Sequence, residues 1–415
     1  MSERFIGLIH RRKRTAEGEA RPTRVVVIDP EGTTTNYDLE NEFAEFDFVV
    51  GRLPTAYRPA EEADDVENFP RHWQLKKTRG KGSGFQVPCE FTGLKPGDQV
   101  ATILGGSGSA LTTALFRQGE KIGAKVWCLP SYELKQVRGS EEKDNDPFLL
   151  AKLLQDDPER FFPVTARSVS YLEVLVAYRE WKDAQAARIA ASQRLGQRLV
   201  GKLFLAVGLH PEAEILDRYQ AALSSDKILE ALETEEGRRE RELEKLVKAL
   251  PLFERLRERG IGIGTVAAIV AAVGNISRFP SRDGFVAYLG VHCKDGKLAR
   301  RRTGEVANWV TTTRTALWNF VCISCNRNPD SFWGTRLRLN KERLRAKHPE
   351  VEIYTGTDGK PKKRYTDGHI HKMAIWRTAT QVARWIYNQW TVLERQGDGD
   401  PNLPVIPIER EPVLV

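Results

Sequence analysis

A chain of 415 residues is too long for one ordinary core, and we expect two or three domains. Its formal charge of +8 indicates a polyanionic partner, and its hydrophobic content of 40% is enough to bury real cores. The five cysteines form an odd set, which argues against a disulfide framework. No segment is long and apolar enough to span a membrane, and Met1–Gly18 lacks the apolar core of a secretion signal, so we expect a cytoplasmic protein.

The first part of the chain predicts an α/β domain. We expect residues 1–22 to form a basic, weakly ordered lead-in and residues 23–164 to form this domain. It opens with the apolar run Val25–Ile28, which is typical of a buried strand. Residues 55–84 are polar and contain several Pro and Gly, and they predict an insertion. The alternation of strands and helices that follows predicts a mixed sheet.

Three acidic residues of this domain stand where predicted elements end or begin. Asp29 follows the first strand, Glu90 follows a short strand at 85–89, and Asp146 begins a helix. Each also has an ordinary explanation, as a turn residue, a loop carboxylate or a helix cap. Together they fit a site for two Mg²⁺ (or Mn²⁺) ions, because Mg²⁺ prefers oxygen ligands and two ions can stabilise both oxygens of a breaking phosphodiester. The pattern predicts a ribonuclease H-like (RuvC-like) nuclease domain.

Residues 165–258 predict a helical arm. The segments 171–200 and 228–259 space their apolar residues as long amphipathic helices do, and Gly208–Pro211 separates them. We expect an antiparallel helical hairpin or coiled coil. It either packs only against itself or joins two copies of the chain in a homodimer.

A second helical region, 259–395, precedes a tail at 396–415. It begins with a glycine-rich turn at 260–264 between two predicted helices. Such a turn exposes backbone N–H groups at a helix N-terminus, where a phosphate can bind. A tight helix connection is an equal alternative.

Basic residues gather in short clusters, which are typical of phosphate binding. Solvated loops are the alternative explanation for any one cluster. Among the tryptophans, Trp333 is the best candidate for stacking on an exposed base. The residues predicted to contact nucleic acid are Lys76, Lys77, Arg79, Arg300, Arg301, Arg302, Arg314, Lys362, Lys363 and Arg364.

Several motifs resemble one family of insertion-sequence transposases, the DEDD transposases that use a bridge RNA. The resemblance covers most of residues 24–395. The motifs are Ile261–Gly264, Ile276–Ser281 and Ala287–Gly290 in the C-terminal region, and Ile28–Asp29, Glu90–Gly93 and Asp146–Ala151 in the first domain.

Two departures from this family bear on function. The family's last two acids are three residues apart, whereas Lys143 stands three residues before Asp146. Asp144, or alternatively Glu142, would have to take that role. The family's recombinases also have a nucleophilic serine in a Ser-Gly pair after the Leu-Gly motif, and the segment 291–297 contains no serine.

This combination is most similar to the RuvC-containing (TasR-like) Tas effectors of tandem-interspaced-guide-RNA systems. The resemblance implies an α/β nuclease domain, a coiled-coil arm and an all-α Nop-like domain that holds a guide RNA. It implies an RNA-guided DNA endonuclease that cuts target DNA, with two metal ions bound by Asp29, Glu90, Asp144 and Asp146. Two alternatives stay open: a DEDD-family transposase or site-specific recombinase, and a non-catalytic Nop-like RNA-binding scaffold.

Overall fold

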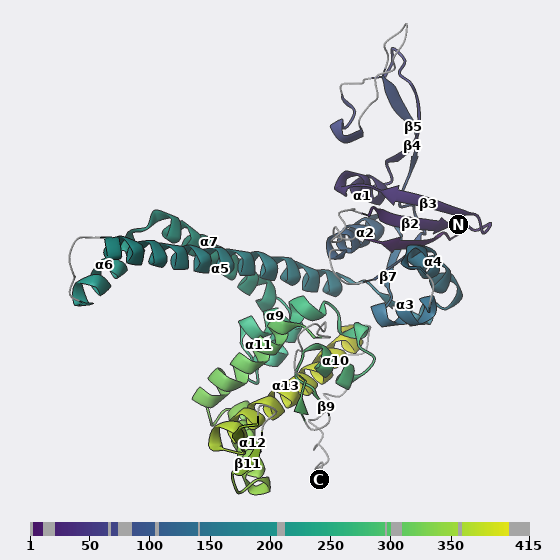
Figure 1. Ribbon diagram of the computed structural model, residues 1–415. Helices are drawn as coiled ribbons and strands as arrows, with labels where there is room; N and C mark the ends of the chain where they lie inside the picture. Colours follow the sequence, from purple (N-terminus) through teal and green to yellow (C-terminus); the bar gives the residue numbers. More distant parts are fainter. Residues whose placement is uncertain are drawn as a thin grey trace. The chain divides into compact units, whose positions relative to one another are not determined.

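The computed structural model describes residues 3–10, 21–64, 68–73, 85–103, 108–139, 142–205, 212–294, 297–299, 309–355 and 359–397. The chain forms two compact units, an N-terminal unit (Met1–Val169) and a C-terminal unit (Ser170–Val415) (Figure 1). Among the described residues, no helix has both the length and the apolar character needed to cross a bilayer.

The N-terminal unit is built on a six-stranded mixed sheet in the order β3-β2-β1-β6-β7-β8. Strand β1 pairs antiparallel with β2 and parallel with β6, and β6 pairs parallel with β7. This order is consistent with the ribonuclease H-like arrangement expected from the sequence. The strands are β1 (Phe5–Ile9), β2 (Thr23–Ile28), β3 (Thr34–Leu39), β6 (Gln99–Thr102), β7 (Lys125–Cys128) and β8 (Phe162–Pro163).

The central strand of this sheet lies inside the expected lead-in. The prediction of a weakly ordered segment is therefore wrong for Phe5–Ile9, which form β1. The side chains of Ile6 and Leu8 are fully buried there, and the backbone of β1 pairs with β2 on one side and with β6 on the other. Five apolar residues next to a basic segment become a strand only through these two partners.

Helix α4 lies against β1 at close range. A Cβ atom on Gly7 of β1 would lie 1.8 Å from the carbonyl oxygen of Pro147, so only glycine allows the first turn of α4 to approach the strand. Leu150 and Leu154 of α4 then bury their side chains in an apolar cluster beside β6. The helices of this unit are α1 (Glu42–Val49), α2 (Ser109–Ile122), α3 (Ser131–Arg138) and α4 (Asp146–Asp156), with short 3₁₀ turns at Arg71–Trp73, Lys143–Asn145 and Pro158–Arg160.

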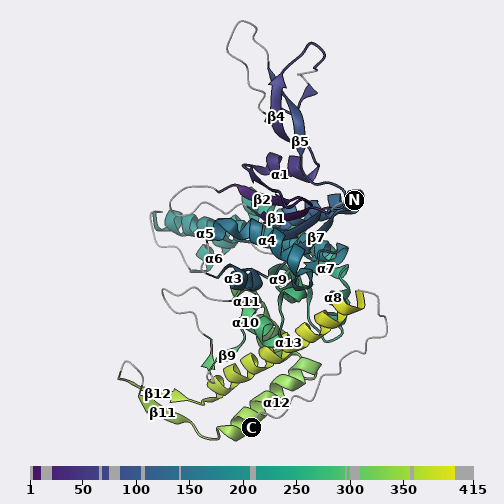
Figure 2. The same ribbon diagram turned by 90° about the vertical axis from the view of Figure 1, so that its right-hand side faces the viewer.

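Strands β4 (Leu53–Pro59) and β5 (Gln86–Thr92) form a separate two-stranded sheet. It projects away from the six-stranded sheet (Figures 1 and 2). The predicted insertion at 55–84 thus begins within β4. Its residues 65–67 and 74–84 lie outside the described part of the chain.

A helical arm leads into the C-terminal unit. It consists of α5 (Ala166–Leu205), α6 (Glu212–Ser225) and α7 (Lys227–Lys248). Helices α5 and α7 run antiparallel, since Glu236 of α7 pairs with Arg188 of α5 while Arg239 pairs with Glu180, closer to the start of α5. The arrangement is the helical hairpin that the sequence predicts.

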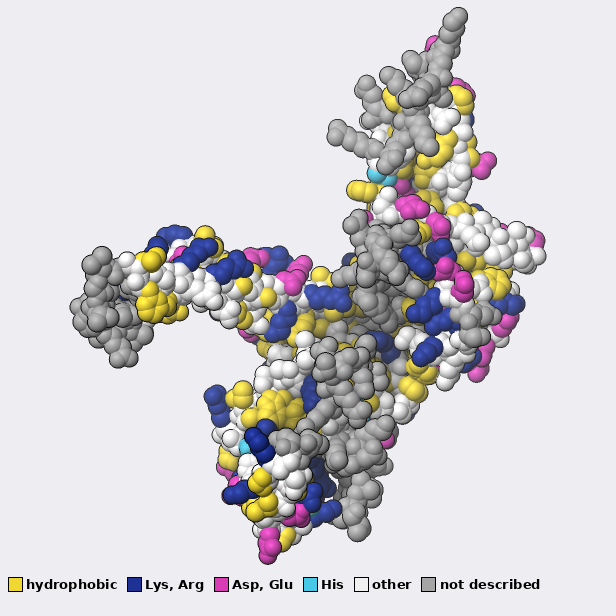
Figure 3. All heavy atoms as spheres, viewed as in Figure 1, with side chains coloured by type: hydrophobic (Ala, Val, Ile, Leu, Met, Phe, Trp, Pro, Cys, Tyr) yellow, Lys and Arg dark blue, Asp and Glu magenta, His cyan; other side chains and the backbone are white. Residues whose placement is uncertain are grey.

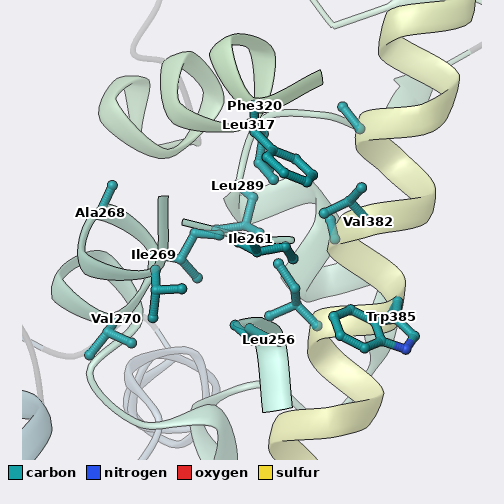
Figure 4. Packing of buried hydrophobic residues seen from close by; sticks show 14 of the residues in the cluster. Leu256, Ile261, Ala268, Ile269, Val270, Leu289, Leu317, Phe320, Val382 and Trp385 are labelled. Carbon is teal, nitrogen blue, oxygen red and sulfur yellow. The ribbon is translucent and has the colours of Figure 1, made fainter. Parts of the chain in front are cut away.

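The rest of the C-terminal unit packs around α9, whose side chains are buried almost all round. Figure 4 shows Ile269 of α9 with Leu256, Leu289, Leu317 and Val382 from neighbouring elements in one apolar cluster. The remaining helices are α8 (Pro251–Arg257), α9 (Ile263–Val273), α10 (Arg282–Tyr288), α11 (Thr311–Asn319), α12 (Phe332–Lys347) and α13 (Asp367–Gly397), with a 3₁₀ turn at Ile276–Arg278 and a π-helical segment at Phe320–Cys325. Two small hairpins complete it: β9 (Cys293–Lys294) with β10 (Lys297–Leu298), and β11 (Glu352–Thr355) with β12 (Pro361–Arg364).

Candidate nucleic-acid interface

Asp29 does not lie near the start of α4, where the predicted ligands Asp144 and Asp146 are found. It follows β2 in the tight turn to β3, and its carbonyl oxygen accepts a hydrogen bond from the N–H of Gly32 at 2.8 Å. Because β2 is antiparallel to β1, Ile28 pairs with Phe5 at the beginning of β1. Asp29 therefore stands at the opposite end of the sheet from the turn that precedes α4.

Glu90 lies outside the six-stranded sheet altogether. It is an exposed residue of β5, opposite Ala56 in the projecting hairpin. The predicted short strand before it exists, but that strand does not deliver the carboxylate to the other acids.

Asp144 and Asp146 are neighbours in sequence, and each already has cationic partners. Asp144 is exposed and pairs with Arg21 at 2.6 Å and with Arg24 at 3.5 Å. Asp146 is only 4% exposed, and its two carboxylate oxygens accept hydrogen bonds from Nη1 of Arg138 at 3.0 and 2.8 Å. The charge of Asp146 is thus compensated within the protein.

The structure does not assemble the predicted metal site. Within the described ranges, which include all four acids, no group of three or more His, Cys, Asp or Glu side chains is placed to hold a metal ion. In α/β sheets, ligands collect at the carboxyl ends of parallel strands, which here are the ends of β1, β6 and β7. These ends have Ile9, Ile103 and Leu129, which all belong to one apolar cluster or pack against it. This set of side chains does not fit a divalent cation.

The predicted basic contacts can be located only in part. Lys76, Lys77, Arg79, Arg300, Arg301 and Arg302 lie outside the described residues. Arg314 is directed into its own unit: its guanidinium lies over the rings of Trp309 and Trp376 and donates a hydrogen bond to the carbonyl oxygen of Ala299 at 2.7 Å. Its observed role is to hold residues 297–299 against α11.

Lys362, Lys363 and Arg364 all lie on the exposed hairpin β11–β12. The register places Lys362 opposite Tyr354, and Lys363 opposite Ile353 on the other face. Basic and apolar side chains therefore alternate on both faces of the hairpin. That pattern suits contact with a phosphate backbone and its bases.

The base of this hairpin is held by a stack of three rings. Tyr365 stacks on His348 with ring centroids 3.8 Å apart and on His369 with centroids 5.7 Å apart. Arg364 places its guanidinium over the ring of Tyr365 and donates a hydrogen bond from Nε to Glu352 at 2.6 Å. The stack fixes β12 to the beginning of α13.

Helix α12 presents a basic face that the sequence analysis missed. The helix contains six basic residues and one acidic residue. Lys341, Arg343 and Lys347 are exposed and have no acidic partner in the described part of the chain. On the opposite side, Asn340 is buried and donates hydrogen bonds to Thr378 and Gln381 of α13, both at 2.9 Å, which sets the rotation of the helix. Figure 3 shows basic side chains over this part of the molecule.

The sequence contains a signal for this basic face, whereas the surface position expected for Trp333 is not observed. The density of Arg and Lys between 336 and 347 was the sequence signal that could have revealed it. Trp333, by contrast, is not a surface platform: it is 3% exposed, and its ring packs against Phe332 and Trp385. Its bulk anchors the start of α12 in the core.

One segment of the chain is similar to a known family. Residues 256–331 match the Transposase IS116/IS110/IS902 family, and this segment begins at the end of α8, includes α9 to α11 and ends just before α12. No curated protein matches the chain. The family match supports an insertion-sequence transposase lineage.

Proposed function

We propose that this protein binds nucleic acid as a member of the insertion-sequence transposase lineage, and that its C-terminal unit holds the phosphate backbone through α12 and the hairpin β11–β12. The observation that supports this most is the basic face of α12, which directly follows the transposase-like segment 256–331. The activity that the lineage favours is the cleavage and joining of DNA.

Lys341, Arg343 and Lys347 gain little from the protein itself, since they have no ion-pair partner among the described residues. Each can neutralise a phosphate and release a counterion, which is the main source of affinity in such interfaces. Tyr354 is 44% exposed on the neighbouring hairpin and offers a ring on which a base can stack.

The binding proposal is tested with two triple variants that remove equal charge. Lys341→Gln, Arg343→Gln and Lys347→Gln together should reduce affinity for structured RNA or duplex DNA, with a salt dependence shallower by about 2–3 in log–log slope. The matched control is Lys227→Gln, Arg238→Gln and Lys248→Gln on α7, where each exposed cation already pairs with a glutamate. Fluorescence anisotropy at several salt concentrations measures both. An equal loss of affinity in the two triple variants would mean that the effect comes from net charge alone, and it would contradict the proposal.

Catalysis and the RNA partner need a second experiment. The protein is purified with its bound nucleic acid, any RNA is sequenced, and the complex is incubated with matching DNA and Mg²⁺. Joined DNA products are the expected result for a transposase or recombinase. A defined RNA without cut or joined DNA would favour the scaffold instead. Guided cleavage that disappears in Asp29→Ala would favour the endonuclease, which has less support because its four carboxylates lie on separate elements.

A further inference from the structure

A pocket lined by basic side chains lies at the carboxyl end of β1, in the N-terminal unit. It is a shallow depression that is partly open to solvent. Three segments meet there: the end of β1, the segment that enters β2, and the turn that leads into α4. The lining residues are Ile9, His10, Arg21, Pro22, Arg24, Lys143, Asp144 and Pro147.

The charges in this pocket favour an anion. Arg21, Arg24 and Lys143 oppose the single carboxylate of Asp144. Both guanidinium groups converge on that carboxylate, Arg21 on one oxygen at 2.6 Å and Arg24 on the other at 3.5 Å. Arg24 also pairs through Nε with Asp38, which does not line the pocket, at 3.6 Å. Lys143 has no ion pair within the described ranges. The pocket thus has an excess of positive charge, and one anionic group already sits between two arginines.

The backbone favours an anion as well. Helix α4 begins at Asp146 beside the pocket, and the N-terminus of a helix has a partial positive charge. The N–H of Asp146 already donates to the carbonyl oxygen of Lys143, and Pro147 has no N–H. Asp144 can give way to a stronger anion at low cost. It is 41% exposed, and Arg21 is 50% exposed, and ion pairs between exposed groups contribute little to stability.

We propose that this pocket binds a phosphate group of a nucleic-acid strand and not a divalent cation. Two arginines offer forked donors that match phosphate oxygens, and Lys143 adds a point charge. The pocket contains Asp144, one of the four predicted metal ligands, but its other charged groups are cationic. Only the identity of the strand depends on the proposed function of the C-terminal unit; the preference for phosphate comes from the pocket itself.

The test uses two substitutions with opposite expected effects in the full-length protein. Lys143→Gln should weaken binding of a short single-stranded DNA labelled at its 3′ end and make the salt slope shallower by about 0.7, the value for one phosphate contact on a single strand. Asp144→Asn should tighten binding and steepen the slope, because it frees Arg21 and Arg24 for the phosphate. At a metal site, Asp144→Asn would remove a carboxylate ligand and weaken binding.

The control is Lys152→Gln, on the same helix but outside the pocket, where Lys152 is 48% exposed and pairs with Asp156 at 3.0 Å. The proposal would be overturned if Lys143→Gln and Lys152→Gln had equal salt slopes for strand binding, or if the Asp144→Asn variant bound the strand more weakly. Thermal melting of each variant confirms that folding is intact. Inorganic phosphate should compete with the strand in the unmodified protein and less in Lys143→Gln.

Two further arms separate the possible sources and the two proposals. If Lys143→Gln weakens binding of 5′-phosphorylated strands but not of 5′-hydroxyl strands, the pocket binds the phosphate at a strand end. If it weakens binding of both kinds of strand equally, the pocket binds a backbone phosphodiester. If the α12 triple variant leaves binding unchanged while Lys143→Gln weakens it, the pocket stands and the proposed function of the C-terminal unit fails.

Discussion

Single carboxylates of the N-terminal unit serve to join different segments of the chain. Asp98 is almost fully buried and accepts hydrogen bonds from Nε and Nη2 of Arg4 at 2.8 and 2.6 Å. Asp47 is buried and accepts hydrogen bonds from the indole of Trp73 at 2.7 Å. Asp146 with Arg138 follows the same rule. A buried acid in this chain is therefore a structural tie, and an acid's position next to a predicted strand does not distinguish a tie from a metal ligand.

Breaking one of these ties should be costly. Arg138→Leu leaves the carboxylate of Asp146 buried without its partner and should lower the free energy of unfolding by about 3 kcal/mol. Urea unfolding measures the change. The double variant Arg138→Leu with Asp146→Leu should lose less than Arg138→Leu alone, since no uncompensated charge remains. Additive losses would contradict a coupled pair.

Cys325 should be inert in the folded protein. Burial raises the pKa of its thiol to about 12, whereas the ordinary value is 9.0, and only the thiolate is nucleophilic. Iodoacetamide at pH 8 should modify the exposed Cys89 but not Cys325, as mass spectrometry will show. Both should react in urea. Because the pKa is raised on folding, this thiol's contribution to stability is complete below pH 9 and is lost as the pH rises toward 12. Modification of folded Cys325 at pH 8 would contradict this account.

At the scale of elements, local patterns were readable in the sequence and pairing was not. The helix that begins at Asp146 and the long helices of the arm follow from apolar spacing within a few turns, and Asp226 caps α7. Strand β1 has no such signal, because its burial comes from β2 and β6. Without β1, the apolar run before Asp29 reads as the first strand of the sheet, whereas it is β2, and Asp29 therefore lies at the opposite end of the sheet from the start of α4. The direction of a strand depends on its distant partners, which one sequence does not reveal.

The contact between β1 and α4 gives an element-scale prediction. Gly7→Ala should destabilise the protein by about 3 kcal/mol, because the new Cβ would overlap the carbonyl oxygen of Pro147. Gly264→Ala in the first turn of α9 is the matched control, since a Cβ there meets nothing within 4 Å. It should be neutral or stabilise slightly. Thermal unfolding compares the two, and equal effects would exclude close packing at Gly7 as the cause.

At the scale of the whole molecule, each unit has an apolar cluster of its own among the described residues, and the two clusters share no residue. The cluster beside β6 belongs to the N-terminal unit, and the cluster around α9 belongs to the C-terminal unit. Each unit therefore contains the apolar burial that a cooperative transition requires. The sequence predicted more than one domain from length alone, but composition does not reveal which helices share a core.

We expect calorimetry to resolve two unfolding transitions in the full chain. Arg138→Leu should lower the melting temperature of one of them, and Ile269→Ala should lower the other, since Ile269 is fully buried in the second core and its truncation costs about 2–5 kcal/mol. A single transition that both variants shift equally would mean that the units unfold together.

The isoleucines at the ends of β1 and β6 also limit how this protein can evolve. An acid at Ile9 or Ile103 would put a charge against the apolar cluster, and such a charge is tolerated only when a cation and the remaining ligands are already there. A lone substitution would therefore be removed by selection for stability before a second could make it useful. The two isoleucines therefore block the stepwise appearance of a metal site at this edge of the sheet. The basic pocket beside them can still change and acquire new ligands.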